Sequence, residues 1–379
     1  MRRNRLRGEA PGSEDIYEME KFEKRMERIS QLASIQLHNT IVILGKFDGF
    51  HLGHQKLLEK ALERKETHAR QHPGAEELRV VIFTFDVYPV RVLAKSEEDR
   101  DYGSHVSPVR TIQTREERFT DSVPDGVDYI VEFPFNKKTM AMEPEQFVKE
   151  VLVNRLGVRE IICGKDFRFG KDRKGNVQTL RELGSSYGFE VVVVPKVTIR
   201  FHDEIRKEAV PGTQSVQGEE LEISSTLIKE ELAKGHMEHV TAMLGRPFYI
   251  DGTVQKGKQL GRTIGFPTAN LMAPGRKMLP PDGVYAVRVI FLNPCMASGP
   301  SYYGITNIGR RPTFDDGDHR TVETFLFDFS GDLYETEIRV EFWHYIRPER
   351  KFADVQQLTK QMQADAKEAR AYFQKGSHS

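Results

Sequence analysis

The sequence predicts an α/β protein in which a parallel sheet with crossover helices is followed by a small antiparallel β-barrel and a terminal helix. Short β-branched runs alternate with helical patterns between Thr40 and about Pro195, and glycine-punctuated alternating segments take over near Met243. The length of 379 residues also exceeds that of one typical domain, which holds roughly 100 to 200 residues. We therefore expect at least two domains with separate cores.

Five runs in the first part have the length and composition of strands. They are residues 41–44, 80–85, 129–133, 160–163 and 190–194, and a helical pattern over 55–64 follows the first of them. This order of strand and helix is typical of βαβ units, whose strands are parallel.

The second part alternates apolar and polar residues over 284–290, 322–329 and 335–342. We expect the last two to form a hairpin across Ser330, Gly331 and Asp332. Residues 353–373 repeat apolar residues at helical spacing, which predicts a final helix packed on the barrel.

Composition excludes several classes of function. Lys plus Arg and Asp plus Glu number 56 each, so no charge excess indicates a nucleic-acid or membrane surface. No apolar run approaches the roughly 18 residues of a membrane span. Cys163 and Cys295 lie far apart, which supports neither a disulfide framework nor a thiolate zinc site and favours a reducing cytoplasm. Residues 1–35 are basic at first but lack a signal-peptide core, and we interpret them as an extension.

The segment 43–54, ILGKFDGFHLGH, joins the first strand to the first helix. Ligands of open α/β sheets bind beyond the carboxyl ends of strands, and a helix N-terminus attracts phosphate. Gly45, Gly49 and Gly53 allow close backbone approach, while His51 and His54 would donate hydrogen bonds to phosphate oxygens as charge develops. The alternatives are surface histidines at a helix cap or a metal-binding pair, although no nearby Cys or third His has suitable spacing.

A second element, ISSTLIK at 223–229, opens another predicted helix with hydroxyls and a cation. Alone it is a good N-cap. Together with the histidine segment it resembles the prokaryotic-type FAD synthetase adenylyltransferase module, in which an HxGH motif and an ISSTxIR-like motif hold the ATP phosphates. The resemblance implies a Rossmann-like nucleotidyltransferase domain over 36–235, with His51 and His54 catalytic and ATP contacts at Gly45, Phe47, Asp48, Gly49, Gly53, Ser224, Ser225, Thr226 and Lys229.

The same resemblance extends to residues 164–170, GKDFRFG. It implies contacts of Asp166, Phe167 and Phe169 with flavin or adenine, with core packing of the two Phe side chains as the alternative. The chain departs from the commonest family pattern at Lys46, Tyr88 and Lys229. Lys cannot reproduce the bidentate contact of Arg. These departures therefore give adenylyl transfer weaker support than the activity indicated by the C-terminal part of the chain.

The C-terminal part of the chain contains a second candidate phosphate-binding segment, GKQLGRTIGFPTAN at 257–270. Its glycines would allow close approach to a polyanion, and alternation would place Thr268 and Asn270 on one strand face as oxygen ligands for Mg²⁺. A simple turn would explain the glycines but not the whole string. The candidate phosphate-binding residues here are Gly257, Lys258, Gly261, Arg262, Gly265 and Pro267.

This string, with the segments 282–285, 306–313 and 322–325, resembles the riboflavin kinases. The resemblance implies a kinase domain over 244–379 in which Thr268 and Asn270 hold Mg²⁺ and Asn307 lies near ATP. Arg310 would lie near the flavin, and Glu323 would be the base for the riboflavin 5′-hydroxyl. Phosphoryl transfer to a primary alcohol independently requires such a carboxylate; the alternative is a strand Glu in a surface ion pair.

We therefore expect a bifunctional enzyme that phosphorylates riboflavin to FMN and then adenylylates FMN to FAD, with ATP as co-substrate, Mg²⁺ as cofactor, and no nucleic-acid or membrane partner. One alternative keeps the kinase while the first module is inactive or redirected to another phosphorylated acceptor. The other is a non-catalytic flavin-binding regulator, against which the intact Thr268, Asn270 and Glu323 argue.

Overall fold

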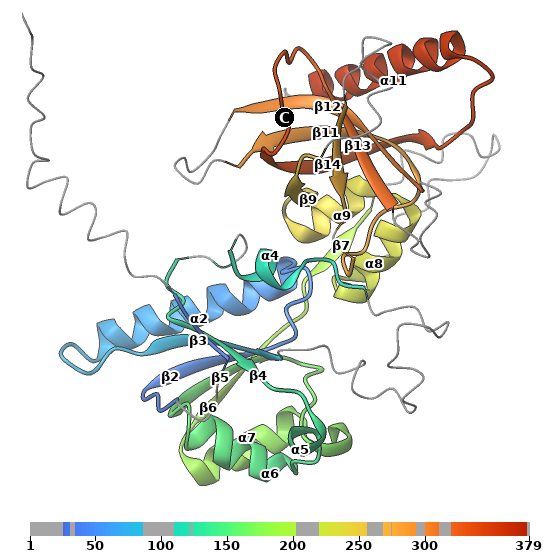
Figure 1. Ribbon diagram of the computed structural model, residues 1–379. Coiled ribbons are helices and arrows are strands. Elements are labelled where there is room, and N and C mark those ends of the chain that lie inside the picture. Colours follow the sequence, from blue (N-terminus) through green and yellow to red (C-terminus); the bar gives the residue numbers. More distant parts are fainter. Residues whose placement is uncertain are drawn as a thin grey trace, which may run out of the picture. The chain divides into compact units, whose positions relative to one another are not determined.

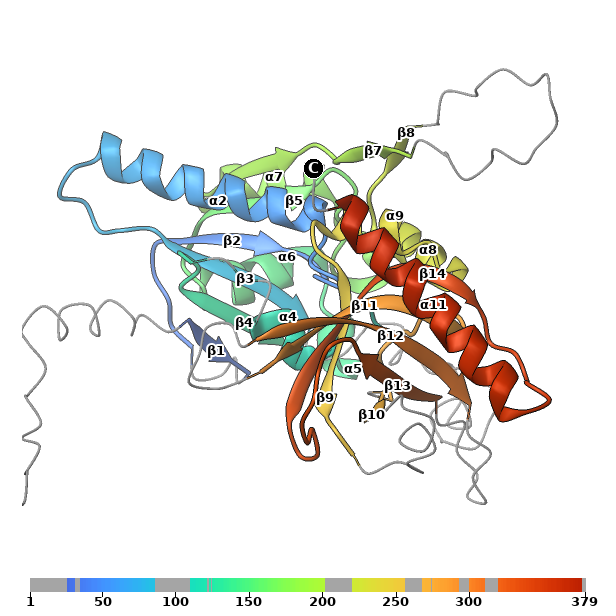
Figure 2. The same cartoon turned by 90° about the horizontal axis from the view of Figure 1, so that it is seen from above.

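The computed structural model describes two compact units of the chain, which Figures 1 and 2 show in two views. The description covers residues 26–30, 35–85, 110–120, 123, 125–201, 220–255, 268–273, 275–292, 300–310 and 320–376, without the side chains of 119, 120, 310 and 376. The candidate residues Gly257, Lys258, Gly261, Arg262, Gly265 and Pro267 lie outside it, as do Tyr88 and most of the N-terminal extension.

The units are not simple halves of the sequence. The first takes residues up to Lys46, then Lys56–Ser104 and Val123–Pro195, and the second takes Phe47–Gln55, His105–Ser122 and Lys196–Ser379. The histidine segment is therefore assigned to the unit that also holds the barrel.

The first unit is built on a six-stranded sheet in the order β1-β4-β3-β2-β5-β6, and every neighbouring pair in it is parallel. All five predicted strands are present, and β1 was not predicted. The strands are β1 Glu27–Ile29, β2 Thr40–Leu44, β3 Arg79–Phe85, β4 Tyr129–Phe133, β5 Val158–Gly164 and β6 Glu190–Val194.

Helices cover both faces of this sheet, with α2 on one face and α5, α6 and α7 on the other (Figure 1). Their bounds are α2 Leu52–Gln71, α5 Lys137–Met140, α6 Pro144–Phe147 and α7 Val177–Tyr187, with a π-helical turn η2 Val148–Val153 and a 3₁₀ turn η3 Lys171–Arg173. Strands covered on both sides are largely apolar: all five residues of β2 are buried, and all but Thr40 are apolar.

The second unit is an antiparallel sheet in the order β10-β13-β12-β11-β14-β9. Its two edges meet beyond β9, where the Gln255 amide donates to the Asn270 carbonyl at 2.9 Å. The sheet therefore curls into the expected barrel around a core that includes Tyr285, Phe342 and Phe248. The strands are β9 Phe248–Thr253, β10 Thr268–Met272, β11 Gly283–Phe291, β12 Ser301–Arg310, β13 Arg320–Leu326 and β14 Glu337–Pro348.

The predicted hairpin across residues 330–332 was wrong. Strand β13 pairs with β10 and β12, whereas β14 pairs with β11 and β9. The connection instead crosses the barrel end, because Phe329 packs edge-on against Phe291 and Tyr302 at 5.6 and 5.1 Å. The amide of Glu335 then donates to the Val254 carbonyl at 3.0 Å, beside β9.

The other elements of the second unit surround this barrel. They are α4 Arg115–Thr120, β7 Thr198–Arg200, β8 Glu220–Glu222, α8 Ser225–Lys234, α9 Met237–Leu244 and α11 Val355–Gly376. The predicted terminal helix is confirmed as α11, and Ala369 packs with Ile305 and Phe327 on the outer face of the barrel. Among the described residues, no helix has the length and hydropathy required to cross a membrane.

Candidate functional site

The histidine segment forms a strained elbow before α2. Phe47, Gly49 and Phe50 have positive φ angles of 52°, 92° and 47°, a region that side-chain-bearing residues seldom adopt. The rings of Phe47 and Phe50 are fully buried and stack with their centroids 5.2 Å apart, so packing holds the backbone in place. A Cβ on Gly49 would lie 2.9 Å from Ile112 Cδ1, which explains why glycine stands there.

Asp48 connects the two predicted phosphate-binding elements. Its carboxylate is buried, accepting a hydrogen bond from the Ile112 amide at 2.8 Å and lying 2.6 Å from Lys229 Nζ. The Ser225 hydroxyl donates to the Asp48 carbonyl at 2.8 Å. Segments about 180 residues apart in sequence are thus brought together in one unit.

The start of α8 has the predicted cap. The Ser224 side chain accepts from the Leu227 amide at 3.2 Å, and Thr226 in the first turn is exposed. The helix start therefore offers N–H groups to an anion. Lys229, which the resemblance assigns to ATP, is paired with Asp48, so its charge is partly neutralised by the protein.

His51 and His54 lie face to face, with ring centroids 3.8 Å apart. Both Nδ1 atoms are buried and have no hydrogen-bond partner among the described residues. Buried polar atoms are nearly always bonded to protein, water or a ligand. The histidine pair is therefore the clearest indication of a ligand site in this part of the unit.

Both imidazoles are held in their neutral form. Burial, and then the charge of Arg246, lower the pKa of His51 to about 4. Burial, His51 and Arg118 lower the pKa of His54 well below its usual value. At neutral pH each ring is therefore a single N–H donor, suited to hydrogen bonding and not to acid catalysis.

The titration of His51 can be tested directly. We expect its Cε1–H NMR resonance to titrate near pH 4, where an ordinary histidine titrates near 6.5. Because folded His51 binds fewer protons than unfolded His51 between these values, its contribution to stability should fall by about 1.4 kcal/mol per pH unit as pH drops through that window, and level off below it. His54, whose pKa is also lowered, should add a further loss in the same direction. His51→Asn assigns the resonance, and a midpoint above pH 6 contradicts the prediction.

Two arginines near the histidines were missed by the sequence analysis. Arg246 donates through Nη2 to the Gly49 carbonyl at 3.0 Å, and Arg118 is only 4% exposed. Their charges act on His51 and His54 respectively. Two guanidinium groups near the histidines suit a polyphosphate, but neither residue lies in a motif that would have revealed it.

A buried ion pair supports the segment that carries Ile112. Lys277 Nζ lies 2.5 and 2.6 Å from the two carboxylate oxygens of Glu117, and also 4.5 Å from the Tyr249 ring centroid. Burial raises the pKa of Glu117 and lowers that of Lys277. The charge of Glu117 and that of Lys277 are therefore each stabilised in the protein interior mainly by the other.

We expect Lys277→Met to lower the free energy of unfolding of this unit by about 3–5 kcal/mol, because it leaves Glu117 as an uncompensated buried charge. Trp343 is the only tryptophan and lies in β14, so its fluorescence in urea reports on this unit. Arg200→Met, which breaks the exposed Arg200–Glu220 pair of the same unit, is the control and should cost less than about 1 kcal/mol. Equal losses for both variants would refute the expectation.

The predicted kinase residues form a row across three strands. Asn270 of β10 is opposite Glu323 of β13, which is opposite Asn307 of β12. Side chains at such positions have Cβ atoms roughly 4.5–5.5 Å apart. Thr268 lies on the same face as Asn270, because the alternate residues Ala269 and Leu271 are buried.

Two charged residues, Arg347 near the C-terminal end of β14 and Glu349 just after it, take part in this region. From the sequence, the charged run that contains them allowed either pairing with the site or simple solvation. Asn307 Nδ2 donates to Glu349 Oε1 at 3.3 Å. Arg347 makes a bidentate contact with Asp365 of α11, with shortest distances of 2.9 and 2.7 Å. Asp365 is 2% exposed, so the pair fixes α11 against the strand that ends beside the row.

The other candidate residues fall elsewhere. Gly45 directly follows β2 in the first unit, and its amide donates to the Phe83 carbonyl at 3.3 Å. Phe169 is 6% exposed and packs with Phe147 at 5.7 Å, which agrees with the core-packing alternative. Asp166 is exposed and Phe167 half-buried, and Arg310 ends β12.

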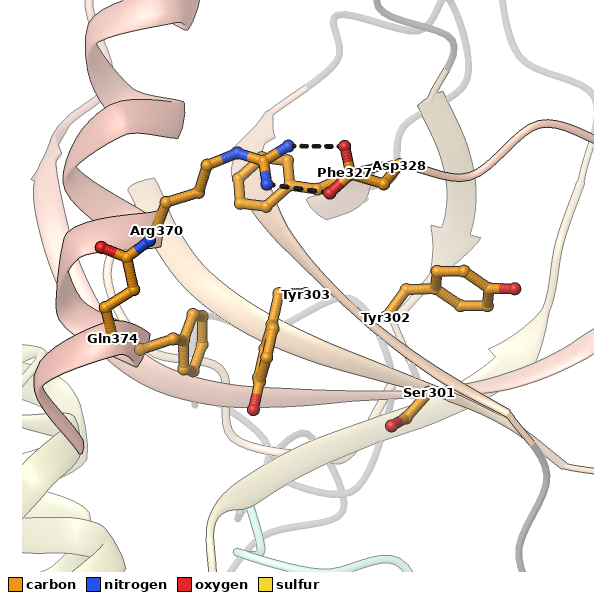
Figure 3. Close-up of a pocket in the computed structure, with 8 residues that line it drawn as sticks. Ser301, Tyr302, Tyr303, Phe327, Asp328, Arg370 and Gln374 are labelled. Carbon is orange, nitrogen blue, oxygen red and sulfur yellow. Dashed lines mark hydrogen bonds and ion pairs between the residues drawn. The ribbon is translucent and has the colours of Figure 1, made fainter. Parts of the chain in front are cut away.

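A cavity of about 290 Å³ lies between the first residues of β12 and the C-terminal part of α11 (Figure 3). Tyr303 stacks on Phe373 at 4.1 Å along one side, and Arg370 closes another through a double contact with Asp328 at 2.8 and 3.0 Å. No candidate site residue lines this cavity, so it is separate from the row that contains Glu323.

Comparison with known proteins first gives the class of enzyme. A family model described as FAD synthetase matches residues 33–206, and one described as riboflavin kinase matches residues 244–373. Both descriptions are of transferases of phosphorus-containing groups.

Similar proteins then give the family. A bifunctional riboflavin kinase/FMN adenylyltransferase of Bacillus subtilis (strain 168) is 31% identical over 336 residues, covering 88% of this chain and 92% of the relative. The protein of that name from Escherichia coli (strain K12) is 32% identical over 351 residues, covering 92% and 98%. The chain belongs to the family of bifunctional riboflavin kinase/FMN adenylyltransferases.

A solved structure supports the fold over nearly the whole length. The crystal structure of a protein described as a macrolide-efflux protein from Streptococcus pneumoniae has a TM-score of 0.71 and 28% identity, covering 90% of this chain and 97% of that one.

Proposed function

We propose that the barrel domain, residues 244–379, transfers the γ-phosphoryl group of ATP to riboflavin, giving FMN and ADP. The observation that carries this proposal is the alignment of Asn270, Glu323 and Asn307 on one face of three adjacent strands. A carboxylate next to two amide side chains provides a proton acceptor beside groups that can orient phosphate and metal.

In this proposal Glu323 accepts the proton of the riboflavin 5′-hydroxyl as its oxygen bonds to the γ-phosphorus and the bond to ADP breaks. Asn307, tied to Glu349, positions the nucleotide. The Thr268 hydroxyl and Asn270 amide oxygen are hard donors of the type Mg²⁺ prefers. Mg²⁺ held there would neutralise charge on the transferring phosphate.

We further propose that residues 36–235 adenylylate FMN. An oxygen of the FMN phosphate bonds to the α-phosphorus of ATP, and pyrophosphate leaves. His51 and His54 donate hydrogen bonds to the charge that develops, while Arg118, Arg246 and the helix starts attract the polyphosphate. Asp48 positions these elements through Lys229 and Ser225. Both reactions consume ATP, which supports a cytoplasmic location.

One observation favours a second candidate function. Lys229 is engaged by the buried Asp48 at 2.6 Å, and Lys lacks the bidentate geometry of Arg. A weakened grip on ATP would leave an active kinase beside an inactive adenylyltransferase, or beside one redirected to another acceptor.

Chromatography of the products separates these possibilities. Purified protein is incubated with riboflavin, ATP and Mg²⁺, and riboflavin, FMN and FAD are resolved. Accumulation of FAD supports both activities, whereas FMN alone supports the second candidate. Riboflavin binding without product would overturn the enzymatic proposal in favour of a flavin-binding regulator.

A further inference from the structure

Two histidines and a glutamate converge where α8 meets α9, at a place that neither proposed reaction uses. Glu231 lies in the last turns of α8, and His236 and His239 lie at the start of α9. The Nδ1 atoms of both imidazoles are 2.7 Å from Glu231 Oε2. One nitrogen or oxygen from each residue lies within 4.8 Å of the other two.

The local sequence creates this convergence. Gly235 has a φ of 80°, a left-handed cap that ends α8 and allows α9 to begin within two residues. His236 and His239 are three apart in the first turn of α9, so their rings lie on one side of it. The backbone also fixes the corner, because the His236 amide donates to the Glu231 carbonyl at 3.1 Å.

The three side chains are held in place to different degrees. Glu231 is 6% exposed, and its other oxygen, Oε1, is 2.7 Å from Lys234 Nζ. Oε2 is therefore the oxygen directed at the imidazoles. The ring of His239 stacks on Phe201 at 3.7 Å with an interplanar angle of 12°. His236 is exposed and leaves a route from solvent to the cluster.

We propose that Glu231, His236 and His239 form a binding site for a divalent transition-metal ion of the Zn²⁺ type. Two imidazoles and one carboxylate are a common ligand set for zinc, and they leave one position open for water. The same set is a poor match for Mg²⁺, which prefers oxygen ligands in octahedral geometry. The site is therefore chemically distinct from the Thr268–Asn270 pair.

Only small movements are needed to admit the ion. Metal–ligand bonds of about 2.0–2.2 Å place tetrahedral ligand atoms roughly 3.3–3.6 Å apart, so the two 2.7 Å contacts must open by less than about 1 Å. Each imidazole binds the ion through Nδ1 in its neutral form, with its one proton on Nε2. A neutral ring moves its Nδ1 proton to Nε2 by exchange with solvent, and a doubly protonated ring releases the Nδ1 proton to solvent. The exposed ring of His236 can make this movement without disturbing the core.

The bound ion would link α8 to α9, and each of these helices also carries residues that make other contacts. Helix α8 carries Ser225 and Lys229 in its first turns, and α9 contacts β14 through Glu238, whose carboxylate is 2.6 Å from His344 Nδ1. An ion at the corner would therefore brace the segment between the adenylyl-transfer residues and the barrel, which predicts a stability effect independent of catalysis.

Titration of the full-length, metal-free protein with Co²⁺, followed by visible absorption and by competition with Zn²⁺, tests the proposal. We expect one equivalent of Co²⁺ to give the spectrum of a site with mixed nitrogen and oxygen ligands, and Zn²⁺ but not Mg²⁺ to displace it. Glu231→Gln and His239→Ala should each weaken binding by roughly tenfold or more. Zn²⁺ should also raise the unfolding midpoint of the parent protein and not that of the variants.

The control is a histidine pair at the end of α2, with His68 in its last turn and His72 just after it, whose ring centroids are 4.8 Å apart. His68→Ala/His72→Ala should retain the Co²⁺ spectrum. Far-ultraviolet circular dichroism, which reports on both units, establishes that each variant is folded. Absence of a stoichiometric spectrum in the parent, or a spectrum lost with His68 and His72 instead, overturns the proposal and leaves the cluster as an ion-pair network with Lys234.

Discussion

Replacing Glu323 by Gln is expected to slow riboflavin phosphorylation by about 10²–10⁴-fold, the usual contribution of a general base. Glutamine keeps the shape and hydrogen-bonding capacity of the side chain between Asn270 and Asn307, but it cannot accept the hydroxyl proton. The loss should appear in kcat, and riboflavin binding, followed by quenching of flavin fluorescence, should change little.

Two comparisons make this test specific. FAD formation from supplied FMN and ATP should proceed at the parent rate in Glu323→Gln, because that reaction is proposed to use other residues. Glu337→Gln changes an exposed glutamate at the start of β14 and should leave both reactions unaffected. A kcat for phosphorylation within tenfold of the parent would show that Glu323 is not the base and would favour the surface-pair interpretation.

Patterns local in sequence predicted most of the fold. The five β-branched runs became parallel strands, of which those inside the sheet are buried on both faces, and the terminal helix followed from its apolar spacing. The hairpin failed because the polar turn residues 330–332 resembled a tight turn, while the partners of β13 and β14 were decided elsewhere. Phe329 packs on Phe291 and Tyr302, a long-range contact that no local pattern encodes.

The same distinction applies to the candidate sites. Motif spacing identified the histidine segment and the start of α8, but the contact that joins them depends on the buried carboxylate of Asp48. Arg118 and Arg246 could not be found, since their relation to the histidines arises only from the tertiary structure. In the barrel, alternation placed Thr268 and Asn270 on one face, and only strand register shows that Glu323 and Asn307 continue the row.

The second large effect is expected at the histidine pair. His54→Ala should lower the rate of FAD formation from FMN and ATP by about 10²–10³-fold, the loss typical of removing one donor that stabilises developing charge. His51→Ala should have a similar effect. Because burial keeps both rings neutral, the parent rate should show no histidine titration between about pH 6 and 8.

The kinase reaction provides the internal control for these variants. The histidine segment and the barrel belong to the same compact unit, so a variant that merely unfolds this unit must lose both reactions together. Loss of adenylyl transfer with riboflavin phosphorylation intact therefore identifies a chemical role. His68→Ala, a partly exposed position later in α2, should change neither rate. If His54→Ala forms FAD within tenfold of the parent rate, the histidines are structural, and charge stabilisation must come from Arg118, Arg246 and the helix starts.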